Sequence, residues 1–100
     1  MNYEVRKEDG WNVISIEGAI NFESSEDLRA LFDRTVSEGA RRVRLELERV
    51  PVADSAGISS ILMLLKSLRT HKGTLEIKGA STNLLEMFKL LKIDKLVKIT

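Results

Sequence analysis

Segments with the two-residue period of β-strands alternate with segments of helical period along most of this chain. Val43 to Leu47 alternates apolar and charged residues, Ile58 to Leu68 carries a helical apolar stripe, Leu75 to Ile77 is again strand-like, and Leu84 to Leu91 is helical. A last strand is expected at Leu96 to Ile99. Strands that alternate with helices in this way are typical of parallel βαβ units. The sequence therefore predicts an α/β fold with a mostly parallel sheet.

An N-terminal β-hairpin is expected to precede these units. Asn2 to Lys7 alternates weakly, Trp11 to Glu17 is a more apolar run, and Glu8-Asp9-Gly10 between them is a turn signal. In the amphipathic helix that follows, Ser24 is the expected N-cap and Gly39 ends the helical pattern. Because the strands of a hairpin run antiparallel, the predicted sheet is mixed, mostly parallel and packed with amphipathic helices.

Length and composition indicate one soluble globular domain that spans residues 1–100. The chain has 43% hydrophobic and 31% charged residues, and its net charge of +1 predicts no general attraction to nucleic acid or to an anionic membrane. It contains no Cys, which agrees with a reducing compartment. Met1 to Gly10 has no apolar core, and no apolar run is long enough to span a membrane. We expect a cytoplasmic monomer with transient partners.

Asp54 and Ser55 lie in the connection between the predicted strand at 43–47 and the predicted helix at 58–68. The first backbone N–H groups of a helix lack partners within the helix and favour an oxygen acceptor or an anion. Asp and Ser are preferred N-cap residues, and such a cap contributes about 1 kcal/mol to stability. Ser55 is therefore either a helix cap or a phosphorylation site, and the pattern alone favours the cap.

The helix at 58–68 has two predicted faces. Its core stripe is expected to comprise Ile58, Ile61, Leu62, Leu65 and Leu68, while the other face carries Ser59, Ser60, Met63 and Ser67. Small hydroxyl residues with one adaptable Met suit a partner surface. A second helix packed there, or an ordinary exposed face, is at least as good an interpretation.

Residues that could support catalysis are few. His71 is the only histidine, and its place at a predicted helix C-terminus favours interaction with the helix dipole over a role as a base. Asp54-Ser55-Ala56-Gly57 lacks the flanking glycines and the Lys of a phosphate-binding loop. We expect no enzyme, no cofactor and no metal site. Five acids are interpreted as solvated turn and helix-start residues and not as a metal cage: Glu8, Asp9, Glu26, Asp27 and Glu48.

Four stretches together resemble the STAS-domain family of bacterial anti-sigma factor antagonists. They are Arg42 to Val50, Asp54 to Ile58, Gly73 to Ile77 and Phe88 to Leu96. The most specific is Asp-Ser-Ala-Gly-Ile, which lies between a strand and a helix as it does in that family. The resemblance covers essentially the whole chain and implies a single STAS domain.

The resemblance implies a partner switch controlled by phosphorylation. In such families a GHKL-type serine kinase, which is also the anti-sigma factor, phosphorylates the serine that follows the Asp. The unphosphorylated antagonist binds this kinase and frees the sigma factor, and a PP2C-type phosphatase resets the cycle. Carried over to this chain, Ser55 is the phosphate acceptor, and the protein is a kinase substrate and not an enzyme.

The family's interface also draws on the loop before the first long helix, here Ile20 to Ser24. Asn21 stands where relatives commonly carry Asp, and Ser59 and Ser60 are backup acceptors. The expected partner-binding residues are Asn21, Phe22, Asp54, Ser55, Ala56, Gly57, Ser59 and Met63. The competing hypothesis is a STAS domain that serves as a non-catalytic scaffold or regulatory subunit in a sensory or transport complex, with Ser55 only a cap.

Overall fold

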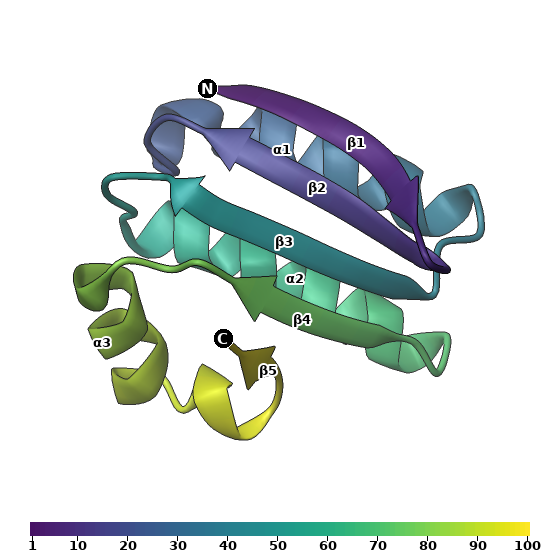
Figure 1. Ribbon diagram of the computed structural model, residues 1–100. Coiled ribbons are helices and arrows are strands. Elements are labelled where there is room, and N and C mark those ends of the chain that lie inside the picture. Colours follow the sequence, from purple (N-terminus) through teal and green to yellow (C-terminus); the bar gives the residue numbers. More distant parts are fainter.

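The computed structural model describes residues 1–100. Its five strands form one mixed sheet (Figure 1). The strands follow one another in the sheet in the order β1-β2-β3-β4-β5; β1 and β2 are antiparallel and the other neighbours are parallel. The predicted α/β fold with an N-terminal hairpin is confirmed. The elements are β1 (Asn2–Glu8), β2 (Trp11–Glu17), α1 (Phe22–Ser37), β3 (Arg42–Arg49), α2 (Ser55–Thr70), β4 (Thr74–Lys78), α3 (Thr82–Leu90), a 3-10 helix (Ile93–Lys95) and β5 (Lys98–Ile99).

The hydrophobic core lies mainly between the sheet and the two long helices, and Leu84 and Phe88 of α3 also belong to it. Both α1 and α2 lie on the same side of the sheet, behind it in Figure 1. Val43, Leu45 and Leu47 alternate along β3 toward this side and are at most 1% exposed. Of the predicted α2 stripe, four residues are buried and Leu62 is half-buried. The alternating and helical patterns in the sequence therefore identify most of the core positions, although the predicted stripe lacks the buried Leu64.

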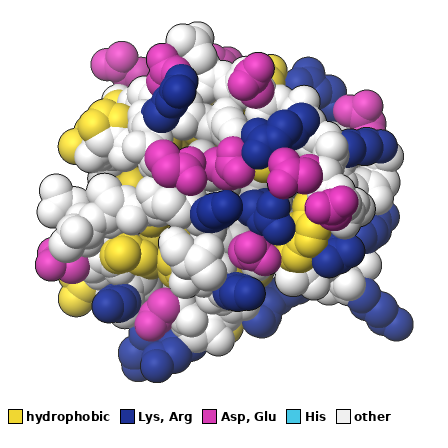
Figure 2. All heavy atoms as spheres, viewed as in Figure 1, with side chains coloured by type: hydrophobic (Ala, Val, Ile, Leu, Met, Phe, Trp, Pro, Cys, Tyr) yellow, Lys and Arg dark blue, Asp and Glu magenta, His cyan; other side chains and the backbone are white.

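The opposite face of the sheet carries no helix, and charged side chains cover it. Figure 2 shows acidic and basic groups intermingled on this face. Arg6 of β1 reaches across β2 to Glu46 of β3, with 2.9 Å between Nη2 and Oε2. The Arg42 guanidinium lies 4.4 Å from the centre of the Trp11 ring. Because successive strand residues point to opposite faces, the same strands supply the apolar core and this polar network.

Two predicted element boundaries are wrong. Helix α1 begins at Phe22, because Asn21 is its N-cap: Asn21 Oδ1 accepts from the Ser24 N–H at 3.1 Å, and Ser24 Oγ accepts from the Asn21 N–H at 3.0 Å. This reciprocal pair is a capping box, in which Ser24 holds the third helical position and is not the cap. The predicted last strand at 96–99 is reduced to Lys98–Ile99, since the N–H groups of Leu96 and Val97 both donate to the Ile93 carbonyl in the turn that follows the 3-10 helix.

The predicted second face of α2 is also partly wrong. Ser60 is 1% exposed, and its Oγ donates to the Ala56 carbonyl at 3.2 Å and lies 3.5 Å from the Ser25 carbonyl of α1. Ser60 therefore faces the neighbouring helix. Ser59 and Met63 remain exposed. A second helix does pack against α2, but it covers only the Ser60 side.

None of the helices combines the length and the hydropathy that crossing a membrane requires.

Candidate functional site

Two short segments bring the N-termini of α1 and α2 together. The Ile20 N–H donates to the Val52 carbonyl at 3.0 Å, and the Asp54 N–H donates to the Ile20 carbonyl at 3.0 Å. Ile20 and Ala53 form an isolated parallel bridge beyond the ends of β2 and β3. The sheet pairing is thus continued as far as the two helix starts. This continuation places the residues around 21 beside those around 55, although the sequence separates them by more than thirty positions.

Asp54 holds both helix starts with one carboxylate. Its Oδ1 accepts from the Gly57 N–H of α2 at 3.0 Å, and its Oδ2 accepts from the Phe22 N–H of α1 at 3.0 Å. The first of these bonds is the N-cap of α2, and the second joins α2 to α1. The Gly57 N–H bond is the main cause that lowers the pKa of Asp54 below its ordinary value, since hydrogen bonds to the charged form favour it. Asp54 is therefore a carboxylate at neutral pH.

Ser55 is the first residue of α2, and its hydroxyl is free. The side chain is exposed, and its Oγ forms no hydrogen bond with another residue. The interpretation of Ser55 as the helix cap is wrong, because Asp54 performs that function. The serine therefore presents an unpaired hydroxyl group at the positive end of the α2 dipole.

Gly57 is required by the close approach of α2 to the Ile20 segment. The glycine is buried, and a Cβ at this position would lie 2.3 Å from both the carbonyl oxygen and Cγ2 of Ile20. Any larger residue would push the two segments apart. Gly57 is consequently hidden beneath residue 20 and has no side chain with which to contact a partner. Ala56, its neighbour, is half-buried.

Large apolar side chains lie exposed around the junction. Phe22 is 77% exposed, Val52 is 56% exposed, and Met63 is 51% exposed two turns along α2. Phe22 and Met63 were predicted to face a partner, whereas Val52 was missed. The sequence offers one signal for Val52: it is an apolar residue in the connection between β3 and α2, which is too short to form a strand of its own. Ser59 is exposed on the same helix, while the burial of Ser60 removes it as a phosphate acceptor.

The single histidine lies at the opposite end of α2 from Ser55. His71 is the C-cap residue, and its Nδ1 lies 2.9 Å from the Ser67 carbonyl oxygen. A helix of 16 residues spans about 24 Å, so the ring is far from the Ser55 hydroxyl. This position agrees with the predicted role at the helix C-terminus. The five acids singled out in the sequence are likewise scattered over β1, the hairpin turn, α1 and β3: Glu8, Asp9, Glu26, Asp27 and Glu48.

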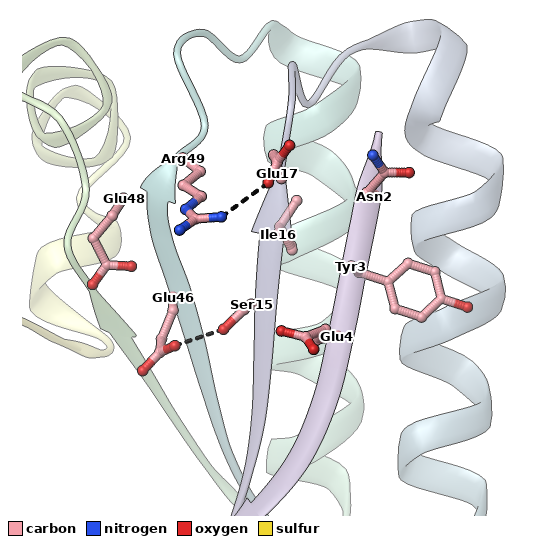
Figure 3. Close-up of a pocket in the computed structure, with 9 residues that line it drawn as sticks. All are labelled: Asn2, Tyr3, Glu4, Ser15, Ile16, Glu17, Glu46, Glu48 and Arg49. Atoms are coloured by element: carbon pink, nitrogen blue, oxygen red, sulfur yellow. Dashed lines mark hydrogen bonds and ion pairs between the residues drawn. The ribbon is translucent and has the colours of Figure 1, made fainter.

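A surface hollow of about 510 Å³ lies on β1, β2 and β3 and contains none of the predicted site residues (Figure 3). Three of its charged groups have partners: Arg49 binds Glu17 at 3.2 Å, and Glu46 binds Arg6 at 2.9 Å and accepts from Ser15 at 2.6 Å. Hydrogen bonds from Arg6, and then from Ser15, lower the pKa of Glu46. Tyr3 points away from the hollow, and its hydroxyl is 3.3 Å from Arg34 of α1. The hollow is thus a feature of the charged sheet face and not of the helix junction.

Comparisons with known proteins identify relatives in sequence and in fold. The profile of the STAS domain family matches residues 2–100. BtrV of Bordetella bronchiseptica, a candidate anti-sigma factor antagonist, is 31% identical over 90 residues, which are 90% of this chain and 78% of BtrV.

Solved structures share the same architecture. The anti-sigma factor antagonist SpoIIAA in its unphosphorylated form superposes with a TM-score of 0.80 at 17% identity, over 99% of this chain and 87% of SpoIIAA. Phosphorylated SpoIIAA from Bacillus gives a TM-score of 0.79 at 18% identity, over 99% of this chain and 91% of that one. A sulfate transporter family protein from Wolinella succinogenes gives 0.78 at 22% identity, over 92% and 77% of the two chains. These structures demonstrate the fold, and the profile and BtrV demonstrate the family. The chain belongs to the STAS domain family and is similar to its anti-sigma factor antagonists.

Proposed function

We propose that this chain is an anti-sigma factor antagonist that switches partners through Ser55. When Ser55 is unphosphorylated, the face around the α1 and α2 N-termini binds a cognate anti-sigma factor, which is a GHKL-type serine kinase. Binding releases the sigma factor, phosphorylation of Ser55 ends the interaction, and a PP2C-type phosphatase restores it. The chain acts in this cycle as a monomer, as a substrate and as a binding partner, without catalysis of its own.

The observation that carries this proposal is the free hydroxyl of Ser55. Asp54 already caps α2 and Gly57 already allows the close contact with Ile20, so the fold assigns no task to Ser55. A serine that is exposed at a helix start and contributes no hydrogen bond is accessible to a kinase. A cap serine would lose its backbone bond on modification, whereas Ser55 has none to lose.

Charge explains how a phosphate at Ser55 would end binding. A phosphoserine adds about −1.5 to −2 charges at neutral pH. It would stand next to the Asp54 carboxylate, whose lowered pKa keeps it ionised. A partner surface that accommodates the neutral Ser55 hydroxyl would, after phosphorylation, have to desolvate two adjacent anionic groups, the phosphate and the Asp54 carboxylate. The α2 N-terminus favours an anion and has no acid in its first turn, so the fold tolerates the phosphate while the interface does not.

The exposed apolar side chains supply the binding energy in this scheme. Phe22 is fixed relative to Ser55 because Asp54 holds its backbone N–H. A buried aromatic anchor at the centre of an interface commonly contributes a large share of affinity. Val52 and Met63 add exposed apolar area, and Asn21, Ala56 and Ser59 supply small or polar contacts.

The test is a comparative capture from lysate of the native host, with wild-type, Ser55→Ala and Ser55→Glu chains as baits. The expected result is a GHKL-type kinase on the Ala bait and its loss from the Glu bait. The captured kinase, incubated with ATP and the wild-type chain, should place phosphate on Ser55, as located by mass spectrometry. Ser37→Glu is the matched control, because it makes the same chemical change at an exposed serine. Ser37 is the last residue of α1, at the end of that helix opposite the proposed partner surface.

Three results would contradict the proposal. One is retention of the same proteins by the Ala and Glu baits, and a second is equal loss of the kinase from the Ser37→Glu control. The third is phosphate transfer to a residue other than Ser55. Glu carries less charge than phosphate, so a partial reduction of binding by Ser55→Glu is the expected minimum.

The fold likeness to a sulfate transporter family protein favours one alternative. In that alternative the chain is a non-catalytic scaffold or regulatory subunit of a sensory or transport complex, and its binding does not depend on phosphate. Identical capture by the Ala and Glu baits, with membrane transport or receptor proteins among the retained set, would support it. The two functions thus give opposite results in the same experiment.

A further inference from the structure

The C-terminal turn of the molecule exposes leucines that the core does not use. Leu90 is 82% exposed, Leu91 is 53% exposed and Leu96 is 45% exposed. Leu90 is the last residue of α3, and Leu91 and Leu96 are the C-cap residues of α3 and of the 3-10 helix, at the β5 side of the molecule in Figure 1. Ile93 and Val97 from the same turn are buried and anchor it. The exposed leucines are therefore not needed to hold the turn in place.

Lysines surround these leucines at a spacing of three residues. Lys89, Lys92, Lys95 and Lys98 are all exposed, and none of them takes part in an ion pair. The only acid between residues 89 and 98 is Asp94, which is half-buried, and Glu86 lies one turn earlier in α3. The stretch 89–98 thus has a local excess of three positive charges, from four Lys and one Asp, within a chain whose total charge is only +1.

We propose that the stretch 89–98 is a docking surface for an anionic lipid bilayer. Leucine side chains enter the apolar boundary of the bilayer while lysines bind the lipid phosphates, so one surface uses both kinds of residue. A protein partner fits less well, since protein interfaces are depleted in Lys and enriched in Trp, Tyr and Arg, and this stretch contains none of those three. Single-stranded nucleic acid would use aromatic stacking, which the stretch does not offer.

The docking would be weak and reversible. Four lysines are at the lower end of the clusters that recognise anionic lipids, and the three leucines bury little apolar area. The attraction should fall as salt is raised, because the lysines are exposed and screened. The surface shares no residue with the Ser55 face. This inference does not depend on phosphorylation of Ser55.

The experiment measures co-flotation of the full chain with lipid vesicles. One set is phosphatidylcholine alone, and the other contains phosphatidylglycerol as about one third of the lipid. We expect binding only to the anionic vesicles. The double variant Lys89→Glu/Lys92→Glu should weaken it more than about tenfold, and Leu90→Ser/Leu91→Ser should also reduce it clearly. All four positions are exposed, so thermal unfolding of the variants should match the wild type.

The matched control is Lys7→Glu/Lys66→Glu, which makes the same change in net charge at two exposed lysines on β1 and α2. It should bind anionic vesicles nearly as well as the wild type. Equal loss in the control would show general electrostatic attraction and overturn the proposal. Absence of binding to anionic vesicles would also overturn it and leave the leucines to a protein partner, which a photocrosslinker at position 90 would capture.

Discussion

The carboxylate of Asp54 accepts a hydrogen bond from the backbone N–H of Phe22 at 3.0 Å, across 32 positions of the chain. The same carboxylate caps α2 through the Gly57 N–H. One side chain therefore fixes the most exposed aromatic residue of the molecule relative to Ser55. The proposed partner surface depends on this connection, because Phe22 and Ser55 belong to different helices.

Replacement of Asp54 by Asn should loosen both helix starts. An amide has one oxygen acceptor where a carboxylate has two. The N–H groups of Phe22 and Gly57 each use one carboxylate oxygen, so at most one of them keeps its acceptor in the variant. We expect a lower midpoint of chemical unfolding and faster amide hydrogen exchange at both Phe22 and Gly57. Faster exchange at Gly57 alone, with Phe22 unchanged, would show that the bond between the helices contributes nothing. Asp33→Asn, an exposed acid in α1 without a side-chain hydrogen bond, is the control.

Ser55→Ala and Ser81→Ala should differ in stability although the substitution is the same. Ser81 is the N-cap of α3, and its Oγ accepts from the Leu84 N–H at 3.2 Å. Loss of such a cap costs about 1 kcal/mol of unfolding free energy. Ser55→Ala removes no hydrogen bond and should change that free energy by less than about 0.5 kcal/mol. Urea unfolding of both variants provides the comparison, and an equal loss in the two would restore the interpretation of Ser55 as a cap.

Gly57→Ala should destabilise the fold and disturb the junction. The added Cβ would overlap the backbone carbonyl of Ile20, which cannot rotate away as a side chain could. We expect a loss of about 1–3 kcal/mol, typical of overpacking. Ser59→Ala, in the same turn of the same helix but exposed, should be neutral or slightly stabilising, because Ala is the best helix former. A Gly57→Ala variant as stable as Ser59→Ala would contradict the close contact.

The Arg6–Glu46 pair should make stability depend on pH in the acid range. Hydrogen bonds from Arg6, and then Ser15, lower the pKa of Glu46 below its ordinary value of 4.5. A carboxyl whose pKa is lower in the folded state stabilises the fold above its unfolded pKa, and this contribution disappears as pH falls through the folded pKa. Glu46→Gln should therefore narrow the difference in stability between pH 6 and about pH 3. Glu86→Gln, at an exposed position outside the network, should leave the pH dependence unchanged.

Phosphorylation of Ser55 should leave the backbone in place. The Ser55 hydroxyl forms no hydrogen bond with another residue, and the α2 N-terminus favours a negative charge. In NMR spectra we expect changes in amide shifts confined to the starts of α1 and α2 and to the segment 50–54. Shift changes that extend through β4 and α3 would indicate a rearrangement of the fold and would contradict a switch based on charge alone.

Much of the fold could be predicted because its signals are local. The alternation in β3, the apolar stripe of α2 and the turn at Asp9-Gly10 each depend on residues a few positions apart. The errors arose where local signals compete. Asn21 and Ser24 are both good N-caps, and only the capping box between them decides that Asn21 is the cap. A helical wheel assigned Ser60 to a polar face, but the position of α1 determines which parts of that face are covered.

The sequence by itself determined the α/β architecture and the location of Asp54 and Ser55 at a strand-to-helix junction. Only the tertiary structure decided which of the two caps the helix, why residue 57 is a glycine, and that Phe22 stands beside them. The physical reason is that these three results follow from the pairing of β2 with β3, which places the Ile20 segment against residues 52–54. Such pairing joins residues far apart in the chain, and no short-range period of the sequence encodes it.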